Sequence, residues 1–455
     1  MTGESTSPHP IFGTDGVRGL AIVEVSPEYV MALGRAVARV LQPERVVLGR
    51  DPRVSGPVLE AAFSAGVSAE GVRVEELGVL PTPALAMIAW RENVPAVVIT
   101  ASHNPYTDNG VKVFAAGGRK LSDDQQIAIE AETHRILDEG TGPIRRDLAV
   151  GVVMRRSDGV SEYVDHLVSV FGEGALAGLR VVIDTANGAM SKVAPLVLQR
   201  LGADVIVMND APDGTNINDR CGATAPQALC EFISGTGTGV SVDLGFAFDG
   251  DGDRVIAVDE NGRIVDGDRL IALSAIDRRT SGRLVGNTVV VTVMSNLGFH
   301  RAMASAGIEV VTVPVGDRHV LDAMESGPYE LGGEQSGHII HRDRATTGDG
   351  LLAAIETCLL LSRSGSRFSQ IAAAVMHTYP QVLKNVRVGQ RPDDVAVALA
   401  DEIAAEQALL GVNGRVLVRA SGTEPLIRVM VEAGTAELAN EVADRLVAAA
   451  VRRFA

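Results

Sequence analysis

Short apolar runs and helical stretches alternate along the chain in a unit that occurs three times. The first unit spans residues 46–74, where the strand-like run Val46–Leu48 ends in the polar turn Gly49-Arg50-Asp51. The same order recurs over 181–207, with a helix expected from about Ser191, and over 289–313, with a helix expected after Ser295. Such strand–helix–strand units favour a parallel, helix-covered sheet with right-handed crossovers. The pattern therefore predicts three similar α/β domains with mixed or parallel sheets.

The pattern changes after about residue 370. Residues 416–419 and 426–431 are strand-like and flank a loop, and the stretch 437–454 has a helical pattern. This part indicates a fourth domain of the α+β class. Polar segments with Gly, Pro or Ser near 137–157 and 362–367 mark further boundaries. We expect domains at residues 1–150, 151–257, 258–369 and 370–455.

Composition narrows the functional classes. The net charge of −16 argues against general nucleic-acid binding, which requires basic surfaces. Three widely spaced cysteines, Cys221, Cys230 and Cys358, form neither a zinc pattern nor a disulfide framework, which favours a reducing compartment. The chain contains no apolar run near the ~20 residues of a membrane helix, and the start lacks a signal-peptide core. We expect a cytoplasmic protein that binds neither nucleic acid nor membranes.

A candidate nucleophile follows the apolar run 96–99, in the sequence TASHNP at 100–105. The residue before a proline is pushed out of the helical region, so Ser102 lies in a turn just past the end of a buried strand. Ligands bind at that edge of open α/β sheets. His103 and Lys112 are the nearest basic groups in sequence. On position alone, a serine that only caps a turn is the simpler interpretation.

The sequence DGDGDR at 249–254 contains three carboxylates, at Asp249, Asp251 and Asp253. Closely spaced carboxylates repel one another unless a cation binds them, which favours a catalytic magnesium site. Glu260 would complete an EF-hand, but Arg254 stands where that loop requires glycine, and the flanks 246–248 and 255–258 are strand-like. A solvated acidic turn without metal stays open.

Two further loops carry polar groups suited to a sugar phosphate. The sequence GGEQSGH at 332–338 supplies Glu334, Gln335, Ser336 and His338, and Gly316 and Asp317 lie one loop earlier. These groups suit a polyol, although a polar surface turn has the same composition. The sequence RASGTEP at 419–425 and Arg428 suit a phosphate dianion, with a solvated hairpin loop as the alternative. The candidate phosphate ligands are Arg419, Ser421, Gly422, Thr423 and Arg428.

Together these four elements, one to each predicted domain, resemble the α-D-phosphohexomutase family over almost the whole chain. The resemblance implies four domains around a central cleft, a phosphorylated Ser102, and one Mg²⁺ per subunit bound by Ser102, Asp249, Asp251 and Asp253. It assigns Gly316, Asp317, Glu334, Ser336 and His338 to the sugar and the loop at 419–428 to the non-reacting phosphate. The sequence FGTDGVRG at 12–19, Gln335 and YPQ at 379–381 resemble the branch that acts on amino-sugar phosphates.

The implied reaction interconverts glucosamine 6-phosphate and glucosamine 1-phosphate through a bisphosphate, and it supplies UDP-N-acetylglucosamine and cell-wall precursors. By motif position Lys112 is the first candidate for the general acid/base, with Arg18 nearby to depress its pKa, and His103 is the second. The partner is then a small amino-sugar phosphate, and a homodimer is left open.

Three alternatives remain. A phosphatase using Ser102 would lack the Gly-x-Ser-x-Gly elbow and would leave the phosphate loop unexplained. A non-catalytic sugar-binding module would bind sugar phosphates without turnover. Within the family, phosphoglucomutase or phosphomannomutase activity is the alternative, although those enzymes usually have methionine at position 335.

Overall fold

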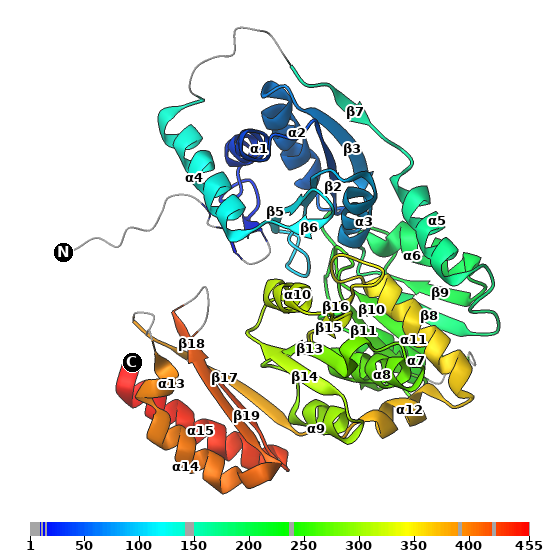
Figure 1. Cartoon of the computed structure of the whole chain (residues 1–455), viewed down its shortest axis with the longest axis vertical. Coiled ribbons are helices and arrows are strands. Elements are labelled where there is room, and N and C mark those ends of the chain that lie inside the picture. Colours follow the sequence, from blue (N-terminus) through cyan, green and yellow to red (C-terminus); the bar gives the residue numbers. More distant parts are fainter. Residues whose placement is uncertain are drawn as a thin grey trace. The chain divides into compact units, whose positions relative to one another are not determined.

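A computed structural model of the chain describes residues 10, 12–13, 16–141, 150–235, 241–389, 394–420 and 425–454 (Figure 1). The chain divides into two compact units. The first comprises Met1–Val293 and Glu309–Ala372, and the second comprises Met294–Ile308 and Ala373–Ala455. No helix among the described residues is both long enough and apolar enough to span a bilayer.

The first sheet of the first unit has the strand order β1-β5-β4-β2-β3-β7, with β6 paired to β5. The pairs β4–β2, β2–β3 and β3–β7 are parallel, and the pairs β1–β5, β5–β4 and β5–β6 are antiparallel. The strands are β1 (Val17–Leu20), β2 (Arg45–Arg50), β3 (Arg73–Val79), β4 (Ala96–Ile99), β5 (Asp108–Ala115), β6 (Arg119–Lys120) and β7 (Val153–Arg155). The helices are α1 (Pro27–Leu41), α2 (Gly56–Ala69), α3 (Thr82–Glu92) and α4 (Asp123–Glu139).

Local sequence signals set the ends of these helices. Ser26 caps α1 by accepting a hydrogen bond from the backbone N–H of Tyr29, and Pro27 occupies the first turn, where a missing N–H costs nothing. Ser122 and Gln125 form a reciprocal capping box at the start of α4. These caps satisfy backbone donors that the helices would otherwise leave without partners.

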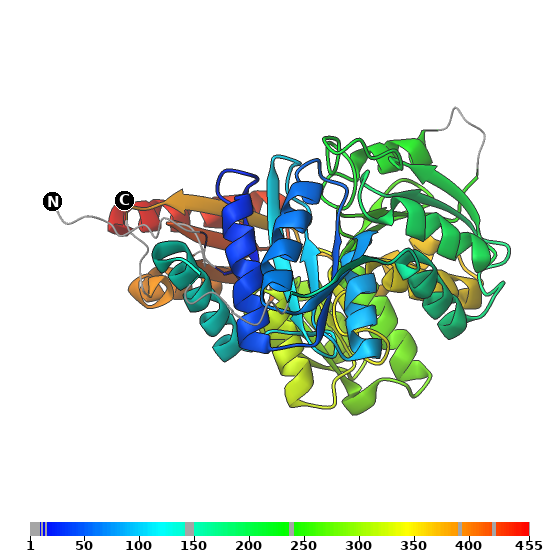
Figure 2. The ribbon, with the colours of Figure 1, turned by 90° about the horizontal axis from the view of Figure 1, so that it is seen from above.

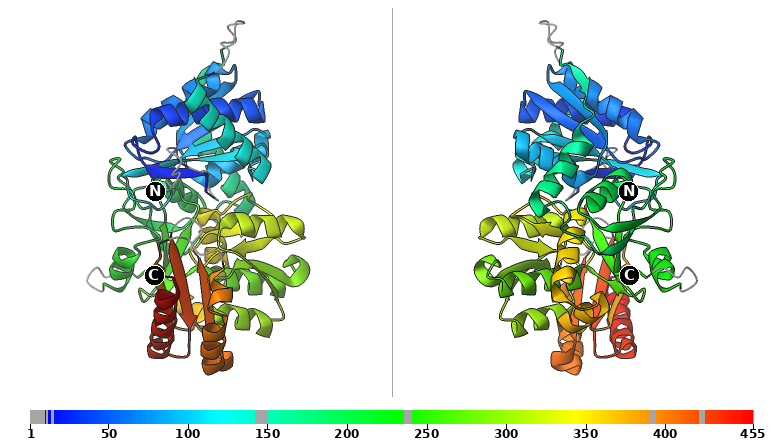
Figure 3. Two further views of the ribbon diagram at one scale, coloured as in Figure 1. Left: turned by 90° about the vertical axis from the view of Figure 1, so that its left-hand side faces the viewer. Right: turned by 90° about the vertical axis from the view of Figure 1, so that its right-hand side faces the viewer.

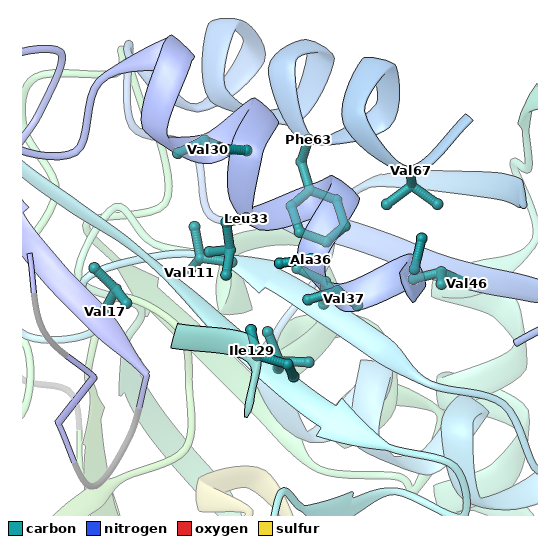
Figure 4. Close-up of a cluster of buried hydrophobic side chains, with 14 of the residues drawn as sticks. Val17, Val30, Leu33, Ala36, Val37, Val46, Phe63, Val67, Val111 and Ile129 are labelled. Carbon is teal, nitrogen blue, oxygen red and sulfur yellow. The ribbon is translucent and has the colours of Figure 1, made fainter. Parts of the chain in front are cut away.

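The core of this part lies between the sheet and the helices α1 and α2, which lie side by side (Figure 2). Figure 4 shows ten labelled members of this cluster: Val17, Val30, Leu33, Ala36, Val37, Val46, Phe63, Val67, Val111 and Ile129. A fully buried aliphatic or phenyl side chain contributes about 1.5–3 kcal/mol. The two helices can approach closely at Gly66 because glycine has no side chain. A Cβ at this position would lie only 2.1 Å from the carbonyl oxygen of Met31. This packing fixes the sheet whose edge carries Ser102.

Two smaller sheets complete the first unit, with orders β12-β11-β10-β8-β9 and β14-β13-β15-β16. Their strands are β8 (Arg180–Asp184), β9 (Asp204–Met208), β10 (Leu244–Phe248), β11 (Val255–Asp259), β12 (Ile264–Val265), β13 (Thr288–Thr292), β14 (Glu309–Val313), β15 (Leu331–Gly333) and β16 (Ile339–His341). The helices are α5 (Gly159–Phe171), α6 (Met190–Arg200), α7 (Gln227–Ser234), α8 (Gly267–Thr280), η1 (Val285–Asn287), α10 (Asp317–Ser326) and α11 (Gly350–Ser364). Helix α12 (Phe368–Val375) continues into the second unit.

The three predicted strand–helix–strand units are confirmed. The pairs β2–β3, β8–β9 and β13–β14 are all parallel, and α6 begins at Met190, one residue from the predicted start. Each of the three sheets also contains antiparallel pairs, so the sheets are mixed.

The second unit is an α+β structure, as the sequence predicts. The antiparallel sheet β17-β19-β18 has α14 and α15 along one face (Figure 3). The elements are α9 (Leu297–Ser305), β17 (Gln381–Arg387), α13 (Val395–Ala398), α14 (Ala400–Leu410), η2 (Gly411–Asn413), β18 (Arg415–Ala420), β19 (Leu426–Glu432) and α15 (Ala436–Phe454). Strand β17 was not recognised in the sequence.

Helix α9 belongs to this second unit, although it follows β13 in the sequence. The Asn296 side chain donates to the carbonyl oxygen of Tyr379 at 2.9 Å and accepts from its N–H at 3.0 Å. The N–H of Leu297 donates to the buried carboxylate of Glu432 at 3.1 Å. These contacts tie the start of α9 to the segment just before β17 and to β19.

Candidate active site

Ser102 lies in the turn that follows β4 and has a left-handed backbone, with φ of 52°. That conformation costs a non-glycine residue roughly 1–2 kcal/mol, so the surroundings must hold it. Its N–H donates to the hydroxyl of Thr100 at 2.9 Å, and that hydroxyl donates to Asp51 at 2.7 Å. Ser102 is fully buried in this turn.

The turn brings Ser102 to the acidic loop, 147 residues further along the chain. The Ser102 hydroxyl donates to Oδ2 of Asp249 at 2.6 Å, and Nδ1 of His103 lies 3.3 Å from the same hydroxyl. The acidic loop connects β10 and β11, so its flanks are strands, as the sequence predicts. Glu260 instead accepts a hydrogen bond from the N–H of Ser369 at 3.0 Å. An EF-hand is therefore excluded.

Asp249, Asp251 and Asp253 are buried, and one oxygen from each lies within 4.8 Å of the other two. Lys112 of β5 donates to Oδ2 of Asp251 at 2.8 Å and to Oδ2 of Asp253 at 2.7 Å. Thr82, at the start of α3, donates to the same Oδ2 of Asp251 at 2.6 Å. Oδ1 of Asp251 and Oδ1 of Asp253 are buried and accept no hydrogen bond from the residues that the structure describes. Anchored carboxylates with unpartnered oxygens fit a bound hard cation.

The pKa values of Asp249 and Asp253 are shifted in opposite directions. Burial and the neighbouring charges of Asp253 and Asp251 raise the pKa of Asp249 well above its usual value. Burial also acts to raise the pKa of Asp253, but Lys112, His338 and Arg254 hold it well below its usual value. The protein's own cations therefore favour ionisation of one carboxylate more than another, and a bound cation would favour ionisation of all three.

The second predicted acid/base, His103, is partly buried. Burial, together with the positive charges of Arg254 and Arg18, lowers its pKa to about 4. The imidazole is therefore neutral at neutral pH and can accept a proton or a hydrogen bond. Arg18 lies on β1 opposite Gly110 of β5, the strand that carries Lys112. The structure thus brings all four predicted catalytic residues to one region.

The predicted sugar loop is the hairpin turn between β15 and β16. A Cβ at Gly337 would lie 2.1 Å from the carbonyl oxygen of Val255, so this glycine allows the turn to pack against β11. Nδ1 of His338 lies 3.7 Å from Oδ1 of Asp253, and its Nε2 lies 3.6 Å from Oδ2 of Asp317. The carboxylate of Glu334 accepts a hydrogen bond from the N–H of Gly316 at 3.2 Å. The two predicted loops of this domain therefore meet beside the acidic loop.

Two residues of the sugar loop differ in environment. The side chain of Gln335 donates to Asp266 at 3.4 Å, at the cap of α8. Ser336 is exposed.

Burial acts to lower the pKa of His338, but Asp253, Asp317 and Glu334 raise it above its usual value.

The candidate phosphate-binding residues lie in the second unit. Arg419 of β18 is directly opposite Arg428 of β19, and burial and the charge of Arg428 lower the pKa of Arg419. Like charges directly opposite each other destabilise a sheet, so an anionic ligand would stabilise this pair. Ser421, Gly422 and Thr423 lie outside the described residues, as do Ile11, Thr14 and Asp15 of the N-terminal loop.

Sequence reasoning missed several residues that hold the site in place. Asp51 and Arg53 follow β2, Thr82 is the first residue of α3, and Asn218 comes from the long connection after β9. The sequence indicates a polar turn after the apolar run at 46–48, but nothing in that turn indicates a buried arginine. A charged residue directly after a buried strand would have been a usable signal.

Four domain models of one protein family match the chain. They are described as phosphoglucomutase/phosphomannomutase domain I (residues 9–139), domain II (161–262), domain III (266–379) and the C-terminal domain (383–449). The chain belongs to the phosphoglucomutase/phosphomannomutase family. This result confirms the predicted phosphohexomutase family and the predicted four-domain fold class, and it makes the chain an enzyme of the isomerase class.

Close relatives within this family carry one name. A phosphoglucosamine mutase from Desulforudis audaxviator is 50% identical over 96% of this chain and 97% of its own length. A phosphoglucosamine mutase from Thermobifida fusca is 48% identical over 96% and 97% of the two chains.

Solved structures share the family fold at lower identity. A phosphoglucomutase/phosphomannomutase family protein from Burkholderia thailandensis has a TM-score of 0.80 at 24% identity, covering 97% of this chain and 98% of its own. An N-acetylphosphoglucosamine mutase from Aspergillus fumigatus, solved with GlcNAc-6P and magnesium, has a TM-score of 0.69 at 19% identity, covering 99% and 97%.

One buried carboxylate next to the sugar loop gives a pH-dependent prediction. Asp349 caps α11 and accepts a hydrogen bond from the hydroxyl of Tyr163 at 2.7 Å, and the N–H of the preceding Gly348 donates to Nε2 of His338 at 3.1 Å. Burial raises the pKa of Asp349 from 3.8 to about 6. Between these values the folded chain keeps a proton that the unfolded chain releases, so stability falls as pH rises.

Asp349→Asn removes this titration and keeps an oxygen for the helix cap. A pKa shift of one unit corresponds to about 1.4 kcal/mol, so the variant should gain roughly 2.4 kcal/mol relative to the parent between pH 4 and pH 7. Urea unfolding at both pH values measures the gain. Asp322→Asn, at an exposed position of α10, is the control. If the free energy of unfolding of Asp349→Asn differed from that of the parent by the same amount at pH 4 and pH 7, Asp349 would not keep its proton in the folded chain.

Proposed function

We propose that the protein is a phosphoglucosamine mutase, which interconverts glucosamine 6-phosphate and glucosamine 1-phosphate. The observation that carries the proposal is the 2.6 Å hydrogen bond between the Ser102 hydroxyl and Asp249, which joins the candidate nucleophile to the acidic loop. The names of the relatives at 50% and 48% identity support the choice of substrate. Phosphoglucomutase or phosphomannomutase activity is the alternative.

In the proposed reaction Ser102 is phosphorylated in the resting enzyme. The bond between its Oγ and phosphorus breaks, and the phosphorus bonds to the free hydroxyl oxygen of the sugar phosphate. That hydroxyl loses its proton to a protein base, and the freed Oγ of Ser102 takes up a proton. A glucosamine 1,6-bisphosphate forms. It reorients and returns its other phosphoryl group to Ser102, so the phosphate count of the enzyme is unchanged after each turnover.

The acidic loop and the serine would hold one Mg²⁺ ion through Asp249, Asp251, Asp253 and phosphorylated Ser102. A bound magnesium ion supplies Lewis-acid stabilisation of the charge on the transferring group. Oδ1 of Asp251 and Oδ1 of Asp253, which accept no hydrogen bond from the described part of the chain, support this assignment. Thr82 and Lys112 orient the carboxylate of Asp251 from the side of its other oxygen.

The proton is handled by Lys112 or His103. Lys112 is in contact with two of the three acidic-loop carboxylates, and His103 is 3.3 Å from the serine oxygen and neutral at neutral pH. Arg18, close enough to His103 to lower its pKa, adds positive charge near the transferring group. Lys112 stays the first candidate by its place in the motif. The position of the sugar hydroxyl relative to Lys112 and His103 decides which of the two takes the proton.

The sugar is bound by Gly316, Asp317, Glu334, Ser336 and His338. Their carboxylates, hydroxyl and imidazole supply both donors and acceptors, which a sugar bound in two orientations requires. The distal phosphate is bound by Arg419, Ser421, Gly422, Thr423 and Arg428, because two arginines in register can grip a phosphate through paired hydrogen bonds. The cysteine pattern supports a cytoplasmic location.

The substrate assignment is tested by a coupled assay of the parent enzyme with glucosamine, glucose and mannose 6-phosphates. We expect kcat/KM to be about tenfold or more higher for glucosamine 6-phosphate, since one charge-assisted hydrogen bond to the amino group contributes about 1.5–3 kcal/mol. Ser102→Ala should remove turnover of all three and is the control for the reaction route. A ratio at or below one for glucosamine over glucose phosphate would move the assignment to phosphoglucomutase.

The phosphate assignment is tested with Arg419→Ala. Loss of one charge-assisted hydrogen bond should raise KM for both substrate and product about ten- to a hundredfold and increase the bisphosphate released per turnover. Arg419→Lys should recover only part of the loss because an ammonium cannot bind bidentately. Arg452→Ala, at an exposed arginine of α15, is the control. Parental KM and bisphosphate release in both Arg419→Ala and Arg428→Ala would disprove the assignment.

A further inference from the structure

The main-chain carbonyls of Ser102 and Asn104 each accept hydrogen bonds from the same two side chains. One guanidinium nitrogen of Arg53 donates to the carbonyl of Ser102 at 2.9 Å and to that of Asn104 at 2.8 Å. The side-chain amide of Asn218 donates to the same two oxygens at 2.8 and 3.1 Å. A carbonyl oxygen has two lone pairs, so both carbonyls use their full accepting capacity. Nothing in the proposed chemistry requires these bonds, so they need a separate explanation.

Arg53 is fully buried, and its position is fixed on the opposite side. Its Nε donates to Oδ2 of Asp51 at 2.8 Å, and its backbone N–H donates to Oδ1 of Asp51 at 3.1 Å. It also donates to the carbonyl of Asp108 at 3.0 Å. Asp51 balances the buried charge, so the guanidinium can serve as a rigid donor to the turn that carries Ser102.

Asn218 reaches this turn from a segment more than a hundred residues away. Its own backbone is left-handed, with φ of 58°, and its N–H donates to the carbonyl of Ala186 at 3.0 Å. The acidic loop packs against the same contact. A Cβ at Gly250 would lie 2.6 Å from the carbonyl oxygen of Ser102 and 2.8 Å from Nδ2 of Asn218. The serine turn, the acidic loop and the segment around Asn218 therefore meet at one point.

We propose that Asn218 is a positioning residue, which together with Arg53 holds Ser102 in its left-handed conformation with the hydroxyl directed at Asp249. A serine in that region of φ is held against its own preference, and the four carbonyl bonds define the orientation of the peptide on its C-terminal side. Without the Asn218 amide, the turn can relax and the hydroxyl loses its alignment. The kinetic consequence rests on the proposed function, whereas the ordering of the turn does not.

Asn218 is the better test because removal of Arg53 would leave Asp51 buried and unpaired. In Asn218→Asp the side chain keeps its size, and aspartate also tolerates a left-handed backbone. The amide N–H that donates is replaced by a carboxylate oxygen that can only accept. Asn209→Asp is the matched control. Asn209 is also left-handed, with φ of 52°, and within the described residues its side chain makes no hydrogen bond. Asn218→Gly removes the donor while leaving the backbone free to adopt positive φ.

Two measurements follow in the three variants and the parent. Amide hydrogen exchange of the peptide that spans residues 97–108 should be about tenfold or more faster in Asn218→Asp and Asn218→Gly, and parental in Asn209→Asp. In the same two Asn218 variants, kcat and the rate of phosphoryl uptake by Ser102 from a hexose 1,6-bisphosphate should fall about ten- to a hundredfold, with KM within about threefold of the parent.

Parental exchange in both Asn218 variants would overturn the proposal, and so would faster exchange with parental kcat and phosphoryl uptake. Full activity of Asn218→Gly alone would show that the backbone conformation, rather than the donor, matters, and would also overturn it. An inactive parent enzyme would contradict the proposed function, and the exchange data would still decide whether Asn218 orders the turn.

Discussion

Three buried carboxylates, with one oxygen of each within 4.8 Å of the others, are the constraint on which the rest of the site depends. Like charges this close cannot remain ionised in a dry interior without positive charge or donors around them. Lys112 and the hydroxyls of Thr82 and Ser102 provide part of that compensation. Among the described residues, Oδ1 of Asp251 and Oδ1 of Asp253 accept no hydrogen bond, although His338 and Arg254 lie within 4 Å of the latter, and a divalent cation fits both oxygens. The three assembled carboxylates could therefore hold a metal ion.

This constraint also explains the surrounding architecture. Ser102 follows β4, Lys112 lies on β5, and the acidic loop joins β10 to β11, so rigid strands from two sheets hold the reacting groups. The glycines between the aspartates allow other segments to approach, as the close packing of Gly250 against Ser102 shows. The turn of the third sheet adds His338, which lies 3.7 Å from Asp253. Each sheet of the first unit therefore contributes one edge loop to a single region, as open α/β sheets generally do.

Much of this could be predicted from the sequence because the informative signals are local. Apolar runs of β-branched residues predicted the parallel strand pairs, and the spacing of Asp249, Asp251 and Asp253 indicated a cation site before any geometry was known. The strand-like flanks of that loop also argued correctly against an EF-hand. Resemblance to a known family then added the roles of Ser102 and the sugar loop, which composition alone could not supply.

The features that were missed depend on contacts between distant parts of the chain. The sequence around Asn218 contains nothing that indicates a contact with Ser102, and Thr82 looks like an ordinary helix start until it is found at Asp251. Strand β17 was missed because its sequence, QVLKNVR, lacks the strict alternation of apolar and polar residues that marks a half-buried strand. Helix α9 packs with residues that follow it by more than seventy positions. Such contacts follow from tertiary packing, which overrides local pattern.

The central claim is that Ser102 carries the phosphoryl group between two positions of one amino sugar. Peptide mass spectrometry of the parent enzyme, after incubation with glucosamine 1,6-bisphosphate and again after addition of glucosamine 6-phosphate, tests it most directly. The account predicts one phosphate on the peptide that contains Ser102 after the first step, and its loss, with formation of an equal amount of bisphosphate, after the second. Turnover of glucosamine 6-phosphate with no phosphate on Ser102 at any stage, or with the phosphate on another residue, would contradict the account.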